Sequence, residues 1–508
     1  MNIRLQKHIL DEVTNPTGLF IDTHIIAISH DYYAQFHARD INLRKKCVSL
    51  YNKTSLELIG HFNHARYPIN HVAFHPEKTW VLIATGSYDG GYFYEGELIL
   101  WNYTQNDYKS LLTDTREVTS CQFIAGMIEF TISPIDDETD TFQSETYTIA
   151  ESTKFPVHLT ECKKIATTSY EGSPYDETNQ VSLIQQINEY AKQHDKTYVP
   201  SYMAWDMVFI NEHTLAVGLN NGIVEIWDIE KASYQTIKLA PQGSCTQLFY
   251  DPDLNNLTVN IASWDHFPDG NRAVVYQIDL NTYKAKQVFS GNTILSKNKS
   301  GLFLGRQTNF QRKADCDILF NAEFAIIWKK DFGHYDLFNH YIRIDGHEHF
   351  FVLIGTPKNQ HTHKRLIEIE PEKGVIVSEI KIDPNDKHYM YLCAILLNDH
   401  FVIQAKIYNS NPYAKQSYVL FAINKHTQNK IWQYNIPAQV IAFCPSSTDQ
   451  QIIASLTNGE IWIIDILTGE TIKKLNKTNP CGFPLSLARN KNKLAIGYDD
   501  GTVELLQL

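Results

Sequence analysis

The chain has 508 residues, of which 43% are hydrophobic, 20% charged and 12% aromatic, a composition typical of a folded globular protein. Its formal net charge of −12 argues against a general binder of nucleic-acid phosphates, which would carry an excess of Lys and Arg. A chain of this length holds either several ordinary domains or one large repeat architecture.

Membrane insertion and export are not indicated. No run of about 18 apolar residues is present to span a bilayer. Residues 1–12 carry charges throughout and lack the apolar segment of a secretory signal. The expected compartment is therefore the cytoplasm, and no membrane partner is expected.

The eight cysteines show no metal-chelating C-x-x-C spacing. Cys121, Cys245 and Cys444 lie in apolar, strand-like runs, where a thiol behaves as a small hydrophobic side chain. The sequence also lacks a G-x-S-x-G elbow, an H-E-x-x-H helix and a phosphate-cradling glycine loop. We therefore expect no cofactor, no metal site, no catalytic residue and no enzymatic activity.

Short β-branched and aromatic runs recur along the chain, separated by turns that contain Gly, Asn, Asp or Pro. In each unit a large apolar residue followed by a smaller or polar one ends an alternating run. Ten such markers lie mostly 41 to 54 residues apart, with one interval of 78, close to the spacing of four-stranded propeller units. The markers begin at Tyr51, Trp101, Ile149, Trp227, Ile278, Phe320, Ile369, Ile423, Ile464 and Leu506.

Two stretches resemble the WD-repeat β-propeller family. The first runs "GHFNHARYPINHVAFHPEKTWVLIATGSYDG" followed by "LILWN", and the second is "TLAVGLNNGIVEIWDI". The resemblance implies a structural hydrogen-bond chain through His61, Ser87, Asp89 and Trp101, with Trp227 and Asp228 in the second repeat. The other repeats replace the Trp by Ile, Tyr, Phe or Leu, so most of them diverge from the family pattern.

The predicted fold is all-β, a WD-repeat-like propeller of four-stranded blades over 1–508. Radial stacking covers both apolar faces of each blade. We expect one closed ring in which the strand-like segment 3–10 pairs with the last blade, which otherwise ends at Leu508 on its third strand. Ten units exceed the usual four to eight blades. Seven or eight blades are therefore the fallback, and the alternative is a three-unit segment at 1–200 before a seven-bladed propeller at 201–508.

The 78-residue interval predicts an insertion at 152–200. Within it, Leu183, Ile184, Ile187, Tyr190 and Ala191 recur at helical spacing, which predicts an amphipathic helix at about 180–195. Its apolar stripe is expected either to pack on a blade edge or to dock a partner.

Six connections between the second and third strands of a blade are much longer than the short turns at 220–222 and 457–459. They start at residues 87, 133, 263, 305, 355 and 407, and on a single propeller all six would project from one circular face. Binding residues concentrate on loops held by a rigid scaffold. The candidate partner contacts are the aromatic residues and one histidine in these loops, namely Tyr92, Phe93, Tyr94, Trp264, His266, Phe267, Tyr408 and Tyr413.

Three further features of the sequence bear on metal, peptide and nucleic-acid binding. The pairs His347/His349 and His361/His363 have the alternate spacing of metal ligands, but no Cys or carboxylate completes a site. The acidic segment around Asp136 reads as a solvated loop or a surface for basic peptides. The net charge disfavours nucleic-acid binding. An exposed basic stripe would favour it, and the residues that could form one are Arg306, Arg312, Lys313, Lys364 and Arg365.

The favoured function is a non-catalytic scaffold that presents the long aromatic loops to a protein or peptide partner. The alternative is a propeller enzyme, or a metal- or small-molecule-binding protein, that uses the same face or the central channel.

Overall fold

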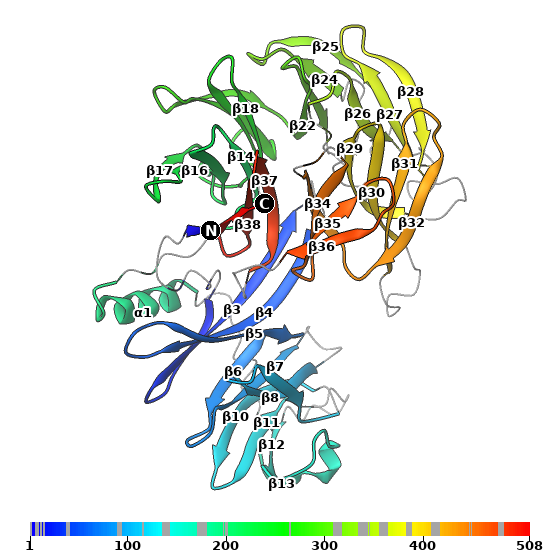
Figure 1. Cartoon of the computed structure of the whole chain (residues 1–508). Coiled ribbons are helices and arrows are strands. Elements are labelled where there is room, and N and C mark those ends of the chain that lie inside the picture. The colour runs from blue at the N-terminus through cyan, green and yellow to red at the C-terminus, as the bar shows by residue number, and fades with distance from the viewer. Residues whose placement is uncertain are drawn as a thin grey trace. The chain divides into compact units, whose positions relative to one another are not determined.

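Two compact units make up the chain in its computed structural model (Figure 1). Unit 1 contains Met1–Gln6, Gln35–Asn42 and Tyr202–Leu508, and unit 2 contains Lys7–Ala34 and Leu43–Ser201. The structure describes every residue except 1–2, 6–9, 11–12, 14–15, 37–40, 89–93, 114–115, 135–142, 170–179, 197, 199–201, 264–265, 308–316, 334–343, 345, 355–363, 383–388, 408–416, 447, 449 and 476–481.

The ten units expected from the repeat are confirmed as ten antiparallel sheets. Nine sheets have four strands, and the β26–β28 sheet has three in the part of the chain that is described. Strands follow one another across each sheet in sequence order. The one exception is the last sheet, in which β1 is added at the outside. All of the described helices are too short or too polar to cross a membrane.

Unit 2 contains two whole sheets, the larger part of a third, and the helix α1, Gln180–Lys192; the ends of β3 and β4 within Gln35–Asn42 belong to unit 1. The first sheet is β2 Pro16–Ile21, β3 Ile25–Phe36, β4 Ile41–Asn52 and β5 Leu58–Ala65. The second is β6 Ile69–Phe74, β7 Trp80–Tyr88, β8 Tyr94–Asn102 and β9 Asp107–Ser110. The third is β10 Val118–Ile124, β11 Met127–Ile132, β12 Gln143–Ala150 and β13 Lys163–Ser169, with the short helix η1 Leu159–Glu161 before β13.

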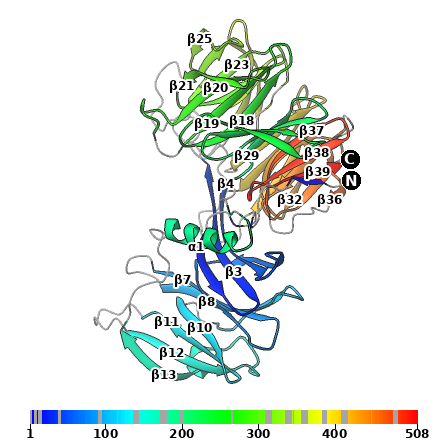
Figure 2. The same cartoon turned by 90° about the vertical axis from the view of Figure 1, so that its left-hand side faces the viewer.

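The two end faces of this three-sheet stack are covered differently. The apolar stripe of α1 lies on the β2–β5 sheet, where Ile187 and Ala191 are buried against Ile26 and Tyr51 (Figure 2). The other end face, on the β10–β13 sheet, is polar, with the Thr131 and Thr146 hydroxyls 3.1 Å apart and Gln122 bonded to Glu129. A stack of repeats needs such end caps when it does not close on itself.

The stretch "SYDGGYFYEGELILWN" forms a longer hairpin than the repeat predicts. β7 and β8 stay paired as far as Tyr88 opposite Tyr94, so only 89–93 connects them. The glycines in these strands allow a close approach of the paired strand β7 and of the segment before β10. A Cβ at Gly96 would lie 2.2 Å from the Thr85 carbonyl oxygen and 2.6 Å from that of Arg116. The expected wide turn is therefore mostly extra strand.

Unit 1 contains the other seven sheets. The first sheet is β14 Asp206–Phe209, β15 Thr214–Gly218, β16 Ile223–Asp228 and β17 Ser233–Lys238. The second is β18 Ser244–Asp251, β19 Asn256–Ala262, β20 Ala273–Asp279 and β21 Lys284–Ser290. The third is β22 Thr293–Lys297, β23 Phe303–Gln307, β24 Asp317–Phe320 and β25 Ile326–Lys330, and the fourth is β26 Phe350–Ile354, β27 Arg365–Glu370 and β28 Val375–Lys381. The last three are β29 Tyr389–Leu397, β30 His400–Ile407, β31 Ser417–Asn424 and β32 Lys430–Ile436; β33 Val440–Pro445, β34 Gln451–Leu456, β35 Ile461–Asp465 and β36 Thr471–Leu475; and β37 Pro484–Asn490, β38 Lys493–Tyr498, β39 Val503–Gln507 and β1 Ile3–Leu5.

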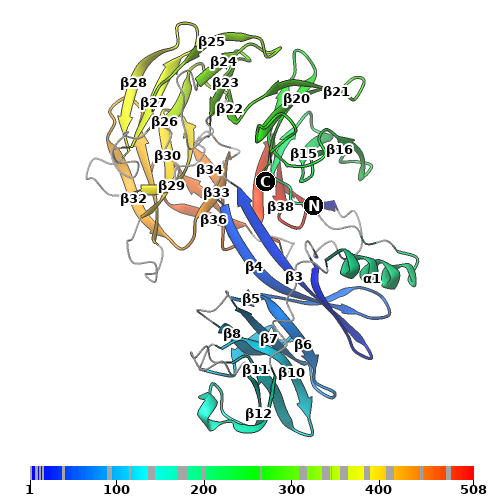
Figure 3. The ribbon, with the colours of Figure 1, turned by 180° about the vertical axis from the view of Figure 1, so that it is seen from behind.

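Apolar contacts join these seven sheets in order, and the last sheet also contacts the first. Each contact involves buried side chains from facing sheets, which is the face-to-face packing of propeller blades. Figure 3 shows the strands of these sheets from behind. Representative pairs in the seven clusters are Val224 with Leu248, Phe249 with Phe303, Leu319 with Ile367, Phe351 with Phe401, Leu420 with Ile464, Ile453 with Ile496, and Val503 with Leu215.

Polar side chains add links between neighbouring sheets. The Gln247 side-chain amide both donates to the Leu295 carbonyl oxygen (2.6 Å) and accepts from the Leu295 N–H (2.9 Å), which imitates a strand pair. Ser486 Oγ donates to the Ala204 carbonyl oxygen at 2.7 Å, and this bond joins the last sheet to the segment before β14. Because these groups are buried, leaving either unpaired would cost roughly 1–3 kcal/mol.

The structure shows two of the elements expected from the sequence. β1 pairs with β39, with Ile3 opposite Leu505 and Leu5 opposite Val503. α1 falls within the expected helical range 180–195. One boundary between the two units falls at Ser201/Tyr202, and unit 1 also includes Gln35–Asn42 at the ends of β3 and β4.

Candidate functional site

Most of the loop residues expected to contact a partner lie outside the described residues. These are Tyr92, Phe93, Trp264, Tyr408 and Tyr413. Tyr94 is the first residue of β8, and its side chain is not described. The six long connections are also divided between the units, because those starting at 87 and 133 belong to unit 2 and the other four to unit 1.

The connection 263–272 is described on both sides of its tip. His266 is exposed, and its Nε2 accepts a hydrogen bond from Arg272 Nε at 3.3 Å. Phe267 is only 5% exposed and packs in the cluster that contains Cys245 and Ile261. Its N–H donates to the Asn271 carbonyl oxygen at 2.7 Å, which folds the loop back over its own sheet. Phe267 is therefore a core residue in this structure, although the sequence places it in a surface loop.

The residues of the expected blade network have different local roles. His61 Nδ1 lies 2.9 Å from Ser49 Oγ, and that hydroxyl lies 3.0 Å from His30 Nε2. Trp101 is fully buried against Phe62, with ring centroids 5.4 Å apart. The described network around His61 thus runs through its own sheet.

Ser87 lies in β7 opposite Glu95, and Asp89 falls outside the described residues. In the second repeat, Trp227 donates to Glu225 Oε2 at 2.9 Å, and Asp228 Oδ1 accepts the Lys231 N–H at 3.1 Å. Trp227 therefore anchors its sheet and Asp228 closes a turn.

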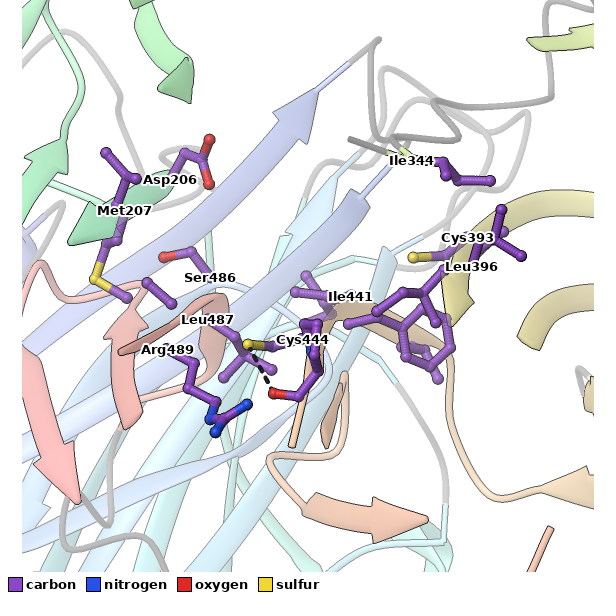
Figure 4. A pocket seen from close by; sticks show the side chains of 18 of the residues that line it. Asp206, Met207, Ile344, Cys393, Leu396, Ile441, Cys444, Ser486, Leu487 and Arg489 are labelled. Carbon is purple, nitrogen blue, oxygen red and sulfur yellow. Dashed lines mark hydrogen bonds between the residues drawn. The ribbon is translucent and has the colours of Figure 1, made fainter. Parts of the chain in front are cut away.

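A cavity of about 500 Å³ lies among the innermost strands of unit 1 (Figure 4). Its walls come mainly from β14, β29, β33 and β37, the first strands of four sheets. This is the position of the central channel in a propeller, where ligands and partners have access to several blades at once. The lining includes Val208, Ile344, Leu396, Ile441 and Leu487 among the apolar side chains, and Asp206, His347, Cys393, Cys444, Ser486 and Arg489 among the others.

The polar groups of the cavity are engaged within the chain. Asp206 Oδ2 accepts the Leu248 N–H at 2.8 Å, and Arg489 Nε donates to the Lys491 carbonyl oxygen at 2.9 Å. Burial raises the pKa of Cys444 to about 12, and its thiol donates to the Pro445 carbonyl oxygen, as the dashed line in Figure 4 shows. A thiol that stays protonated at neutral pH is a poor nucleophile and a poor metal ligand. The cavity is therefore suited to recognition by shape and apolar contact.

Three short, described connections between second and third strands lie near the points where innermost strands begin. Cys245 N–H donates to the Leu219 carbonyl oxygen at 2.9 Å, and Thr457 N–H donates to that of Gln439 at 2.8 Å. The same relation joins Asp499 N–H to Phe483, at 3.1 Å. Each of these three short connections therefore lies next to the start of an innermost strand.

Long and short connections are grouped along the order of the sheets in unit 1. The sheets that begin with β14, β33 and β37 have the short connections 219–222, 457–460 and 499–502. The four consecutive sheets from β18 to β32 have the long ones, at 263–272, 308–316, 355–364 and 408–416. Three of the four cavity walls, β14, β33 and β37, belong to sheets with short connections.

The histidine pair His347/His349 does not form a joint metal site in the structure. His347 Nε2 lies 3.3 Å from the Leu396 carbonyl oxygen, and His349 Nδ1 lies 2.9 Å from Glu368 Oε1. The pair His361/His363 falls outside the described residues. Within the described ranges, no group of three His, Cys, Asp or Glu side chains could hold a metal ion.

The described members of the basic set that would favour nucleic-acid binding do not form an exposed stripe. Arg306 is buried, with its Nε 2.7 Å from Asp317 Oδ1, and Lys364 is buried as well. Arg365 donates to Glu379 at 3.0 Å. Arg312 and Lys313 are not described.

Comparison with known proteins gives no family assignment. No family model matches the chain, and no curated protein does. Among solved structures, the chain is similar to the C-terminal WD40 domain of Sif2, with 10% identity, a TM-score of 0.41, and coverage of 61% of this chain and 96% of that one. It is also similar to the WD40 β-propeller domain of Doa1, with 12% identity, a TM-score of 0.41, and coverage of 60% and 92%.

Proposed function

We propose that unit 1 is a closed seven-bladed propeller and that the chain is a non-catalytic scaffold whose partner binds at the channel end bordered by the long connections. This replaces the single ring of ten units. It is supported by the cycle of apolar contacts through seven sheets and by the pairing of β1 with β39. In this arrangement, β1 covers the outer edge of β39.

One observation carries the functional proposal. The cavity of about 500 Å³ opens among innermost strands, and its polar side chains already have partners within the chain. Catalysis needs a group whose proton or lone pair is available to substrate. An apolar side chain of a partner protein, by contrast, needs only a shaped and desolvated pocket. The partner class is therefore a protein or peptide with an apolar anchor.

The long connections would add contacts around that anchor. The connection 408–416 carries Tyr408 and Tyr413, and 355–364 and 308–316 arise from the two preceding sheets. Aromatic rings next to polar residues are common contact anchors. Phe267 takes no part, because it is buried. A cytoplasmic location and the absence of a nucleic-acid partner stay predictions.

The test replaces 408–416 by the dipeptide Asn-Gly. Strands β30 and β31 are paired up to Ile407 opposite Ser417, so a two-residue turn can join them. Asn221 and Gly222 already form such a turn in the β14–β17 sheet, with φ values of 56° and 62°. We expect the variant to keep its thermal unfolding midpoint and to lose the partner that affinity purification recovers with the unmodified chain.

The matched control replaces 135–142 in unit 2 by Asn-Gly, which also shortens a long connection. The proposal is contradicted if the 408–416 variant retains the partner, or if both variants lose it equally. The cavity volume also lies within the range of small-molecule sites. A small molecule found in the cavity by mass spectrometry of the native protein would therefore favour the alternative function.

A further inference from the structure

The outer strands of the sheets share one irregularity. We call outer strand the last strand of a sheet in sequence order, which pairs with a single neighbour. These are β5, β9, β13, β17, β21, β25, β28, β32 and β36. In seven of these nine described strands the pairing register shifts by one residue, so that one extra residue faces no partner. This is a β-bulge.

The extra residue is a β-branched aliphatic in every bulge. In β36, for example, Thr471 lies opposite Ile464 and Lys473 opposite Ile463, which leaves Ile472 without a cross-strand partner. The extra residues of the seven strands are Ile59, Ile165, Val288, Ile327, Val377, Ile431 and Ile472. Six of them are between 38% and 52% exposed, and Val288 is partly buried.

The bulge has a fixed place in most of these sheets. In five of them the extra residue lies opposite the marker residue of the repeat and the residue before it. Ile472, for example, lies opposite Ile463 and the marker Ile464. A packing accident would not recur at one register position in sheets of different sequence. The bulge is therefore part of the repeat itself.

An outer strand presents unpaired N–H and C=O groups to solvent, which is a template for adding a strand from another chain. A bulge bends the strand and interrupts the regular alternation of these groups. Lysines on the same strands oppose pairing as well. Lys163 and Lys164 lie in β13, and Lys473 and Lys474 in β36.

We propose that this shared bulge blocks strand addition at the outer edges, so that neither a second copy of the chain nor an extended peptide pairs there. The inference is independent of the channel function. It predicts that regularising a single outer edge is enough to make the chain self-associate through that edge.

The strand register shows how to remove the bulge while every other residue keeps its cross-strand partner. Deleting Ile472 would place Thr471 next to Lys473, and both would keep the partners they already have in β35. Deleting Ile165 would do the same in β13, where Lys164 lies opposite Tyr147 and Ala166 opposite Thr146. β13 belongs to unit 2, so the two deletions test the idea in separate units.

The experiment measures self-association of the full chain by sedimentation velocity from low to high micromolar concentration. We expect each deletion to strengthen self-association at least about tenfold over the unmodified chain. Hydrogen exchange should show new, concentration-dependent protection of the amides of the altered strand. The matched controls, Ile472→Thr and Ile165→Thr, keep the bulge and should behave like the unmodified chain.

Two results would overturn the proposal. One is a deletion variant that keeps its far-ultraviolet circular dichroism spectrum and unfolding midpoint yet associates no more than the unmodified chain. The other is association of the threonine variants, which would assign the effect to the side chain. Because the deletions lie in different units, misfolding of one leaves the other decisive.

Discussion

Replacing Arg306 should expose how strongly two neighbouring sheets depend on one buried ion pair. Arg306 Nε lies 2.7 Å from Asp317 Oδ1 on the neighbouring strand, and Nη1 donates to the Leu353 carbonyl oxygen of the next sheet at 2.8 Å. Nη2 donates to the Gly333 carbonyl oxygen at 3.3 Å, and Asp317 Oδ2 accepts the Phe332 N–H at 2.9 Å. The substitution Arg306→Met removes the guanidinium that contacts the fully buried Asp317 carboxylate.

The magnitude follows from those contacts. Breaking a buried pair from one side costs about 3–5 kcal/mol, so we expect Arg306→Met to lose about 4 kcal/mol of unfolding free energy. The double variant Arg306→Met/Asp317→Leu removes the uncompensated charge. It still leaves the Leu353 and Gly333 carbonyls and the Phe332 N–H without these partners, so we expect it to recover only about half of the loss.

The assay is urea unfolding of the full chain, with hydrogen exchange read on peptides that cover β23 and β24, because a chain of two units need not unfold in one step. A loss below about 1 kcal/mol in Arg306→Met would refute the reasoning. So would a double variant that is as unstable as the single one, because the cost would then not come from the isolated charge.

Three further predictions concern single residues. Gly469 has a φ of 78°, and a Cβ there would lie 2.6 Å from Trp432 Cδ2, so Gly469→Ala should cost about 2 kcal/mol or more and change the Trp432 fluorescence; an unchanged unfolding midpoint would contradict this. Burial lowers the pKa of His30 to about 3, so below pH 6.5 the unfolded chain binds a proton that the folded chain does not. Unit 2 should therefore lose about 2 kcal/mol of unfolding free energy between pH 7 and pH 5. Hydrogen exchange measures this loss, and His30→Gln should abolish it. Burial alone would raise the pKa of Glu368, but hydrogen bonds from Lys425, Ser378 and His349 outweigh it and hold the pKa below its usual range; Glu368→Gln should therefore lower the thermal midpoint at neutral pH and have little effect once the pH falls below that pKa, and an equal effect at both would contradict the assignment.

The repeat was the part of the fold that the sequence could predict. A marker such as Ile464 ends an alternating run in each unit, and all ten units form sheets. The helix at Gln180–Lys192 followed from the spacing of Leu183, Ile187 and Ala191. These signals are local, because periodicity and turn residues act within one sheet or one helix.

The division into units was harder to predict because it depends on which faces meet. Thr131 and Thr146 make the outer face of the β10–β13 sheet polar, and this marks the end of a stack. The polar face can be recognised only when the strand register is known, because the register decides which side chains share a face. The bulges at residues such as Ile327 are hidden for the same reason, since an extra residue has no signature in composition.

The candidate site was predicted only in outline. Phe267 looks like a surface ring in a polar loop, yet it packs beside Cys245 because the loop folds back through the Asn271 carbonyl. The cavity residues Val208, Ile441 and Leu487 look like ordinary core positions in their strands. What brings them together is the order in which the sheets pack, which no single stretch of sequence contains.

The central claim, that the partner contacts the channel end of unit 1, is tested most directly by site-specific photo-crosslinking. A photoreactive benzoylphenylalanine replaces Ile441 in the cavity wall in one sample and Ile472 on the outer strand β36 in another. The partner recovered by affinity purification is then added in purified form. The account predicts a covalent adduct from position 441 and none from position 472. An adduct from position 472, with none from 441 in a variant that still binds the partner, would contradict it.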